Sequence, residues 1–165
     1  MVRVRPSTVR KLVLAAILVA GCSDPVAFDP AQLTESHGCG HGFYLGAPDQ
    51  TAGLFLLSNL DMTEAASASG TFQLPGDEWT AELNFGRDLF ANWCDDVIEP
   101  GEPESAVEES WQVEGVLQVV SLPAVGECGE ARAALQQAVA VGPDGSTSEL
   151  GDIDLINESW GCFAG

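Results

Sequence analysis

The chain has 165 residues, with 25 acidic residues against 6 basic ones and a formal net charge of −19. Four of the basic residues lie within the first 11 positions, so the rest of the chain sets all its acids against Arg87 and Arg132. This balance excludes nucleic-acid binding through phosphate neutralisation and disfavours electrostatic attachment to anionic lipid heads. A hydrophobic share of 45% predicts a globular chain, and the length is that of one domain.

The first 21 residues have the organisation of a secretory leader. A basic segment, residues 1–11, precedes an unbroken apolar run at residues 12–20, which is too short to span a bilayer as a helix. The run ends in Val19-Ala20-Gly21-Cys22, which resembles the lipobox of bacterial lipoproteins. The resemblance implies cleavage before Cys22 by signal peptidase II and diacylation of the Cys22 thiol. Two acyl chains form a stable membrane anchor where one is marginal.

The competing interpretation of the leader is an ordinary cleaved signal with a chance cysteine, or an uncleaved anchor. Ser23 follows the cysteine, which by resemblance to enterobacterial lipoproteins favours the outer membrane, although Asp24 comes next. We therefore expect a lipid-anchored protein of the bacterial cell envelope, with the outer membrane favoured. Residues 22–38 contain two prolines and are predicted to be a tether, and residues 39–165 are predicted to form the single folded domain.

Short strands are predicted throughout the domain. Residues 51–60 form an apolar run typical of a buried strand, and residues 79–85 alternate apolar and polar side chains with a period of two. The valine-rich residues 111–122 predict a longer strand in which Gly115 marks a bulge. Four shorter strands are predicted at residues 42–45, 71–74, 147–150 and 153–156.

Residues 131–141 fit both a helical stripe and a strand face. The Gly-Pro-Asp-Gly-Ser turn at residues 142–146 and the compatible partner strand that follows it favour a hairpin. Seven or eight short strands with regular turns predict an all-β fold, an antiparallel β-sandwich of the immunoglobulin-like kind.

Four cysteines remain when Cys22 is set aside: Cys39, Cys94, Cys128 and Cys162. An even number in an exported chain predicts two disulfides. Three pairings are open, and we favour Cys39–Cys94 with Cys128–Cys162 because these close the shorter loops. The preference is small, since the entropy of loop closure changes slowly with loop length.

One cluster is suited to a metal ion. His37, Cys39 and His41 alternate with glycines, and imidazole and thiolate are the ligands that zinc and copper prefer. The cluster supplies at most three ligands and requires a free Cys39, so a glycine-rich turn beside a disulfide is the competing interpretation.

Other groups of residues give weaker indications of a metal, catalytic or sugar-binding site. The acidic residues 95–110 and the pair Asp152 and Asp154, which share one strand face, offer oxygens for calcium but lack the order of a calcium-binding loop. Both histidines lie beside the tether, and neither a nucleophile elbow nor a zinc-protease motif occurs, so a pair of carboxylates is the remaining catalytic option. The tryptophans are expected in the core rather than on a sugar-binding platform: Trp79, Trp93, Trp111 and Trp160.

The sequence thus predicts a non-catalytic binding, interaction or structural module without a cofactor, held to the membrane by its N-terminal lipid. Its expected partner is an envelope protein or a glycan and not a nucleic acid. The alternative is an envelope protein that binds copper or zinc through His37 and His41. The acid excess also suits a high-salt environment, where screening suppresses repulsion between carboxylates.

Overall fold

The computed structural model describes residues 28–60, 69–91, 94 and 100–162, without the side chain of His37. The predicted leader, Cys22 and Trp93 lie outside these residues. The described part contains one short 3-10 helix, η1 (Pro30–Gln32), and is otherwise built of strands. The strands are β1 (Glu35–His37), β2 (Gly42–Gly46), β3 (Ala52–Ser58), β4 (Gly70–Leu74), β5 (Trp79–Arg87), β6 (Ala106–Ser121), β7 (Gly129–Val141) and β8 (Thr147–Trp160).

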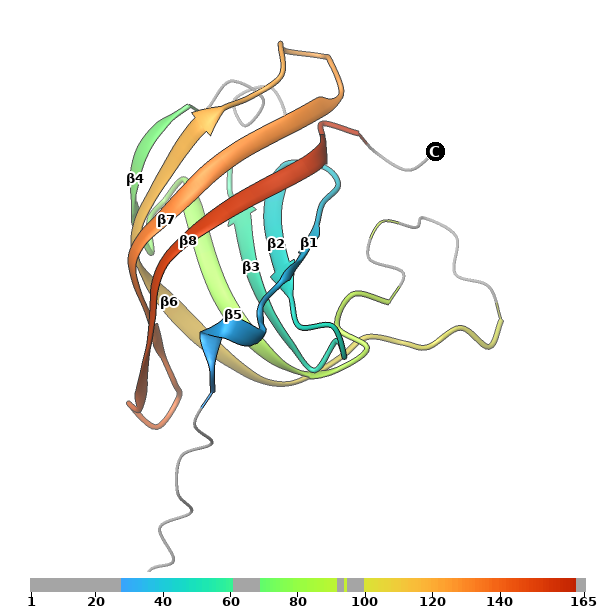
Figure 1. Ribbon diagram of the computed structural model, residues 1–165, viewed down its shortest axis with the longest axis vertical. Helices are drawn as coiled ribbons and strands as arrows, with labels where there is room; N and C mark the ends of the chain where they lie inside the picture. Colours follow the sequence, from blue (N-terminus) through green and yellow to red (C-terminus); the bar gives the residue numbers. More distant parts are fainter. Residues whose placement is uncertain (1–27, 61–68, 92–93, 95–99, 163–165) are drawn as a thin grey trace, which may run out of the picture.

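All the strands belong to one antiparallel sheet. The order is β1-β2-β3-β5-β6-β7-β8, and β4 pairs with β6 beside β5. The sheet curls until β8 approaches β1 and β2, where Gly40 and Trp160 form a parallel bridge (Figure 1). The predicted all-β, antiparallel, two-layered architecture is confirmed. Its two layers are the opposite halves of one sheet that is nearly closed into a barrel.

The period-two prediction is confirmed for the first five residues of β5, whereas Asn84, predicted on the polar face, is 7% exposed, and Phe85 is half-buried. Trp79, Ala81 and Leu83 are buried on the inner face, while Thr80 and Glu82 are turned outward. Because strand side chains alternate between faces, these three residues contribute to the core while Thr80 and Glu82 stay at least partly exposed. The strand therefore forms where its sequence gives it one apolar face.

The ambiguous residues 131–141 lie in a strand, as the hairpin argument predicted. In the turn that follows, the Gly142 N–H donates to the Ser146 carbonyl at 2.8 Å, and the Asp144 carboxylate accepts from the Ser146 N–H at 2.9 Å. The two short strands predicted next are one continuous strand, β8, whose pairing with β7 runs through Gly151 with a local irregularity.

The fold begins earlier than the predicted boundary at residue 39. Leu33 is 7% exposed and belongs to the core, and the ring of Phe28 meets that of Phe85 edge to face at 5.3 Å. The Asp29 carboxylate caps η1 by accepting from the Ala31 N–H at 3.0 Å. Phe28 and Leu33 are isolated apolar residues in a polar, proline-containing segment, so no hydrophobic periodicity indicates their burial.

The barrel interior is filled by side chains. Trp79 is 0% exposed and Trp160 1% exposed, and their rings stack with centroids 6.2 Å apart. Phe43 packs against both. Trp111 is 8% exposed, and its ring meets that of Phe85 edge to face with centroids 5.6 Å apart. The core placement predicted for these three tryptophans is confirmed.

The favoured disulfide pairing is confirmed. Cys39 bonds Cys94 with Cα atoms 5.9 Å apart, and Cys128 bonds Cys162 with Cα atoms 5.0 Å apart. The first bond ties the β5–β6 connection to the segment before β2, and the second ties the β6–β7 loop to the end of β8. Both bonds therefore secure the part of the barrel where β8 meets the N-terminal strands.

Candidate functional site

The line along which β8 meets β1 and β2 is the seam of the barrel, and a buried amide closes one end of it. Asn157, in β8, is 0% exposed, and its Nδ2 donates to the carbonyl oxygen of Gly42 at 2.7 Å. Its Oδ1 accepts from the Ser159 N–H at 2.8 Å. Gly38 packs so closely on Asn157 that a Cβ atom would collide with this amide.

Backbone hydrogen bonds complete the closed end of the seam. The Gly40 N–H donates to the Cys162 carbonyl at 2.8 Å, and the Gly161 N–H donates to the Gly40 carbonyl at 2.9 Å. The predicted glycine-rich turn at residues 37–41 is thus the segment that β8 docks against. Its glycines allow the two backbones to approach within hydrogen-bond distance.

The predicted metal residues lie in this segment. Cys39 is bonded to Cys94, which removes its thiolate from the donor set. His41 lies with its ring centroid 5.2 Å from that of Trp160, and burial lowers the pKa of its imidazole. The backbone of His37 pairs with Tyr44 in β1 and β2. In the part of the chain that the structure describes, no three His, Cys, Asp or Glu residues gather as a metal site.

A second apolar cluster lies outside the barrel, on β2 and β3. It consists of Tyr44, Phe55, Leu89 and Phe90, and the Phe55 and Phe90 rings stack with centroids 5.0 Å apart. A Cβ at Gly53 would come within 2.7 Å of the Phe90 ring, so a glycine is needed beneath it. Burial raises the pKa of Tyr44 to about 12. The Cys39–Cys94 bond holds the connection that supplies Leu89 and Phe90 close to this face.

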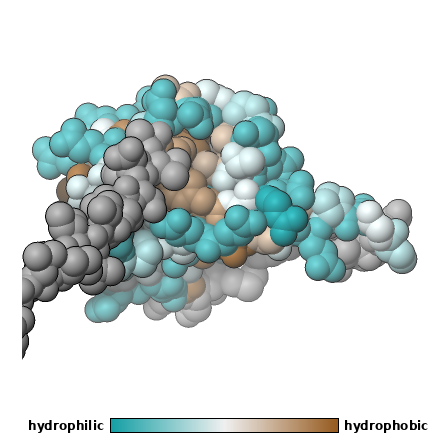
Figure 2. All heavy atoms as spheres, turned by 90° about the horizontal axis from the view of Figure 1, so that it is seen from below, coloured by the Kyte–Doolittle hydropathy of each residue, from teal (hydrophilic) through white to brown (hydrophobic). Residues whose placement is uncertain are grey.

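Away from its closed end, the seam opens into a groove. Figure 1 shows β1 and β8 converging at the end of β8 and diverging toward its start. The groove has a volume of about 480 Å³. Three largely buried leucines contribute to its lining from opposite sides, Leu33 and Leu45 from the N-terminal segment and Leu150 from β8. Seen from below, the molecule shows apolar surface at the centre of the view with hydrophilic surface around it (Figure 2).

The rims of this seam groove are polar. Thr34 and Ser36 line the β1 side, while Asp152 and Asp154 line the β8 side. The two aspartates are exposed, which agrees with their predicted place on one strand face. The Asp152 carboxylate accepts from the Gln137 N–H of β7 at 2.9 Å. The β1 rim was not predicted from the sequence, because residues 30–36 fall within the predicted tether. The one signal for it is Leu33, an apolar residue among polar ones.

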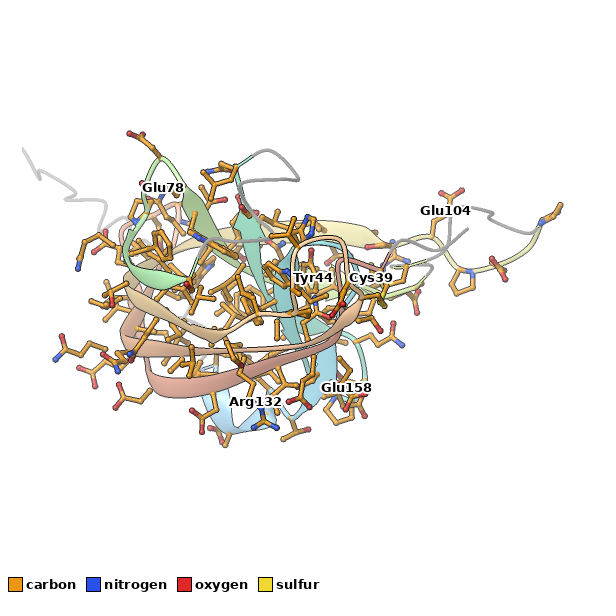
Figure 3. The ribbon with its side chains drawn as sticks, turned by 90° about the horizontal axis from the view of Figure 1, so that it is seen from above. Cys39, Tyr44, Glu78, Glu104, Arg132 and Glu158 are labelled. Carbon is orange, nitrogen blue, oxygen red and sulfur yellow. A yellow bond between two sulfur atoms is a disulfide. The ribbon has the colours of Figure 1, made fainter. Side chains whose placement is uncertain are left out.

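The chain carries a large excess of acidic residues, and its described arginines are paired. Arg87 is paired with Glu108 at 3.1 Å and Arg132 with Glu130 at 2.7 Å, so each arginine already has a carboxylate neighbour. Figure 3 shows Glu78, Glu104 and Glu158 pointing away from the barrel on different sides. The Asp49 carboxylate accepts from the N–H and hydroxyl of Thr51, and these hydrogen bonds lower the pKa of its carboxyl.

No helix among the described residues has the length and apolarity needed to cross a membrane. The chain matches no protein-family model, no curated protein and no solved structure.

Proposed function

We propose that this chain is a lipid-anchored protein of the bacterial cell envelope whose folded domain is a non-catalytic interaction module. The observation that carries the proposal is the seam groove, an opening between two strand edges in an otherwise nearly closed barrel. Side chains fill the interior, so a partner is met on the outside and not enclosed as a cargo. Rigid strands with an exposed opening are a common scaffold for recognition.

The predicted lipid anchor and the two disulfides support a location outside the cytosol. Disulfides persist in oxidising compartments such as the bacterial periplasm and the cell surface. Only residues 23–27 separate Cys22 from Phe28, the first described residue, and an extended chain covers at most about 20 Å over that span. The end of the barrel next to Phe28 is therefore the end nearest the membrane in this proposal.

Metabolic labelling with radioactive palmitate tests the anchor. The full chain, expressed in a diderm bacterium, is expected to incorporate the label and to fractionate with membranes. Cys22→Ala is the matched control and is expected to lose both properties while it keeps the two disulfides. A full chain that remains unlabelled and soluble would contradict the anchored location.

Metal binding through His37 and His41 remains the alternative, with a reduced donor set because Cys39 is bonded. Equilibrium dialysis of the full chain against Cu²⁺ and Zn²⁺ separates the two functions. Tight binding that is lost in the His37→Ala, His41→Ala double variant would support metal handling. Equal retention of metal by both proteins would count against it.

A further inference from the structure

We propose that the seam groove binds an extended polypeptide segment as an added strand on β8, and that this segment alternates basic and apolar side chains. The inference rests on the proposed function and names its partner: an exported or envelope polypeptide with a strand-forming segment of that pattern. Three features of the groove lead to it, namely a strand edge, an apolar floor and an acidic rim.

The strand edge is the outer side of β8. On one side, β8 pairs with β7 from Thr147 to Trp160. On its other side, within the residues that the structure describes, the only bridge is the one between Trp160 and Gly40 at the closed end. The part of β8 that lines the groove is residues 150–154, and this is where we place the added strand. A row of backbone donors and acceptors at a strand edge is a template for another strand, and peptides that add to sheet edges obtain affinity from these backbone bonds.

The floor and the rim set the side-chain pattern of the added strand. Side chains of neighbouring strands lie side by side on the same face of a sheet. Inward side chains of the added strand would meet Leu33, Leu45 and Leu150, each of which is only 7–8% exposed, so apolar residues match this face. Outward side chains would lie beside Asp152 and Asp154, so lysine or arginine is favoured there. Because successive strand residues point to opposite faces, the two preferences alternate along the ligand.

The charge of the chain decides between possible occupants. A second copy would bring its own acid excess against the two aspartates, and like charges that face each other across a strand pair are destabilising. A glycan offers neither the backbone ladder nor a positive charge. A basic, extended polypeptide satisfies the edge, the floor and the rim together.

The probe is a fluorescent synthetic peptide of about eight residues that alternates lysine and valine, a length typical of a strand. Its binding to the full chain, purified in a nonionic detergent, is followed by fluorescence anisotropy at low salt. A block isomer, with all lysines before all valines, has the same composition and charge without the alternation. Two further peptides carry N-methyl groups on alternate residues, in one register or the other, and so block one edge of the peptide each.

The alternating peptide is expected to bind at least about tenfold more tightly than the block isomer, and one N-methyl register is expected to lose binding while the other keeps it. Asp152→Asn with Asp154→Asn is expected to weaken binding about three- to tenfold at low salt, with a smaller effect at high salt, as for two rim charges. The asparagine at residue 152 keeps an oxygen for the Gln137 N–H. Glu78→Gln with Glu127→Gln removes the same charge from exposed sites outside the groove and is expected to leave the affinity unchanged.

Equal affinity of the alternating and block peptides, or of both N-methyl registers, would overturn the proposal. Equal weakening by the two pairs of acid substitutions would also overturn it, because attraction would then be a property of the whole surface. If the chain binds the peptide but incorporates no palmitate, the strand site is supported and the lipid anchor is contradicted. If the chain incorporates palmitate but does not bind the peptide, the anchor is supported and the strand site is contradicted.

Discussion

Asn157 in β8 donates through Nδ2 to the carbonyl oxygen of Gly42 in β2 at 2.7 Å, and this bond joins the last strand to the second across the seam. The same buried amide accepts from the Ser159 N–H through Oδ1. We expect Asn157→Ala to lower the free energy of unfolding by about 1–3 kcal/mol, because it leaves buried backbone groups without partners. Urea unfolding of the full chain, followed by tryptophan fluorescence with the disulfides intact, measures this loss.

Asn157→Asp is the informative companion variant. Aspartate keeps the oxygen that accepts from Ser159, but in its ionised form it cannot donate to Gly42 and it buries a charge. Burial raises the pKa of a carboxyl group, so the ionised form is disfavoured in the fold. This variant is expected to be less stable than Asn157→Ala at neutral pH and to recover as the pH falls. If Asn157→Asp is as stable as the unaltered chain at neutral pH and at the lower pH, the amide does not close the seam.

Tyr44 reports on the β5–β6 connection, because it is the single tyrosine of the chain and burial raises its pKa to about 12. Cys39→Ser with Cys94→Ser is expected to release the connection and return the pKa of Tyr44 toward its ordinary value of 10.0. Cys128→Ser with Cys162→Ser removes the other disulfide and is expected to leave the Tyr44 pKa near about 12. Phenolate absorbance during an alkaline titration measures each value, and equal titration curves for the two double variants would contradict this role of the Cys39–Cys94 bond.

The same raised pKa predicts the alkaline limit of stability. The folded state holds the Tyr44 proton more tightly than the unfolded state, so the contribution of this group is complete below pH 10.0 and is lost as the pH rises through about 12. The unfolding midpoint in urea is therefore expected to fall between these two pH values. A Tyr44→Phe variant, which has no proton to lose, is expected to show a smaller fall over the same range.

Local patterning made much of the sheet predictable. The alternation from Trp79 to Leu83, the Gly115 bulge and the turn before β8 were each visible in a few consecutive residues. Each of these three features depends on backbone preferences or on one apolar face, and both are determined by the residues of a single segment. The observed disulfides close the shorter loops, but loop length gives only a small preference over the two other pairings.

The seam groove could not be predicted in the same way. It exists because β8 meets β1 at one end and diverges at the other, and this depends on the accumulated curl of the whole sheet. Asp152 and Asp154 were recognised as sharing a face, but their relation to Leu33 joins segments more than 100 residues apart. Leu33 lies in a segment whose prolines favour a tether, and a single buried leucine gives no hydrophobic periodicity from which a strand could be predicted.

Gly115 tests the bulge in β6. Its φ is +152°, and a Cβ would approach the Gln136 carbonyl oxygen to 2.9 Å. Gly115→Ala is expected to destabilise the chain by about 1–3 kcal/mol, because strain and a backbone clash combine. The control is Gly126→Ala in the exposed β6–β7 loop, where φ is +84° and no atom lies within 4 Å of the added carbon. Both are compared by thermal unfolding, and equal losses would show that the contact with Gln136 is without consequence.

The acidic surface predicts a strong dependence of stability on salt. The arginines already lie against Glu108 and Glu130, so repulsion among the remaining carboxylates opposes compact folding and is screened as ions are added. Raising NaCl from about 0.05 M to about 2 M shortens the screening length to a few ångströms and is expected to raise the thermal midpoint by several degrees. The matched variant replaces exposed Glu78, Glu104 and Glu127 with glutamine. It is expected to begin with a higher midpoint at low salt and to gain less from added salt, because it has less repulsion to screen. A midpoint that does not change with salt in the unaltered chain would remove repulsion as a factor and with it the high-salt interpretation of the composition.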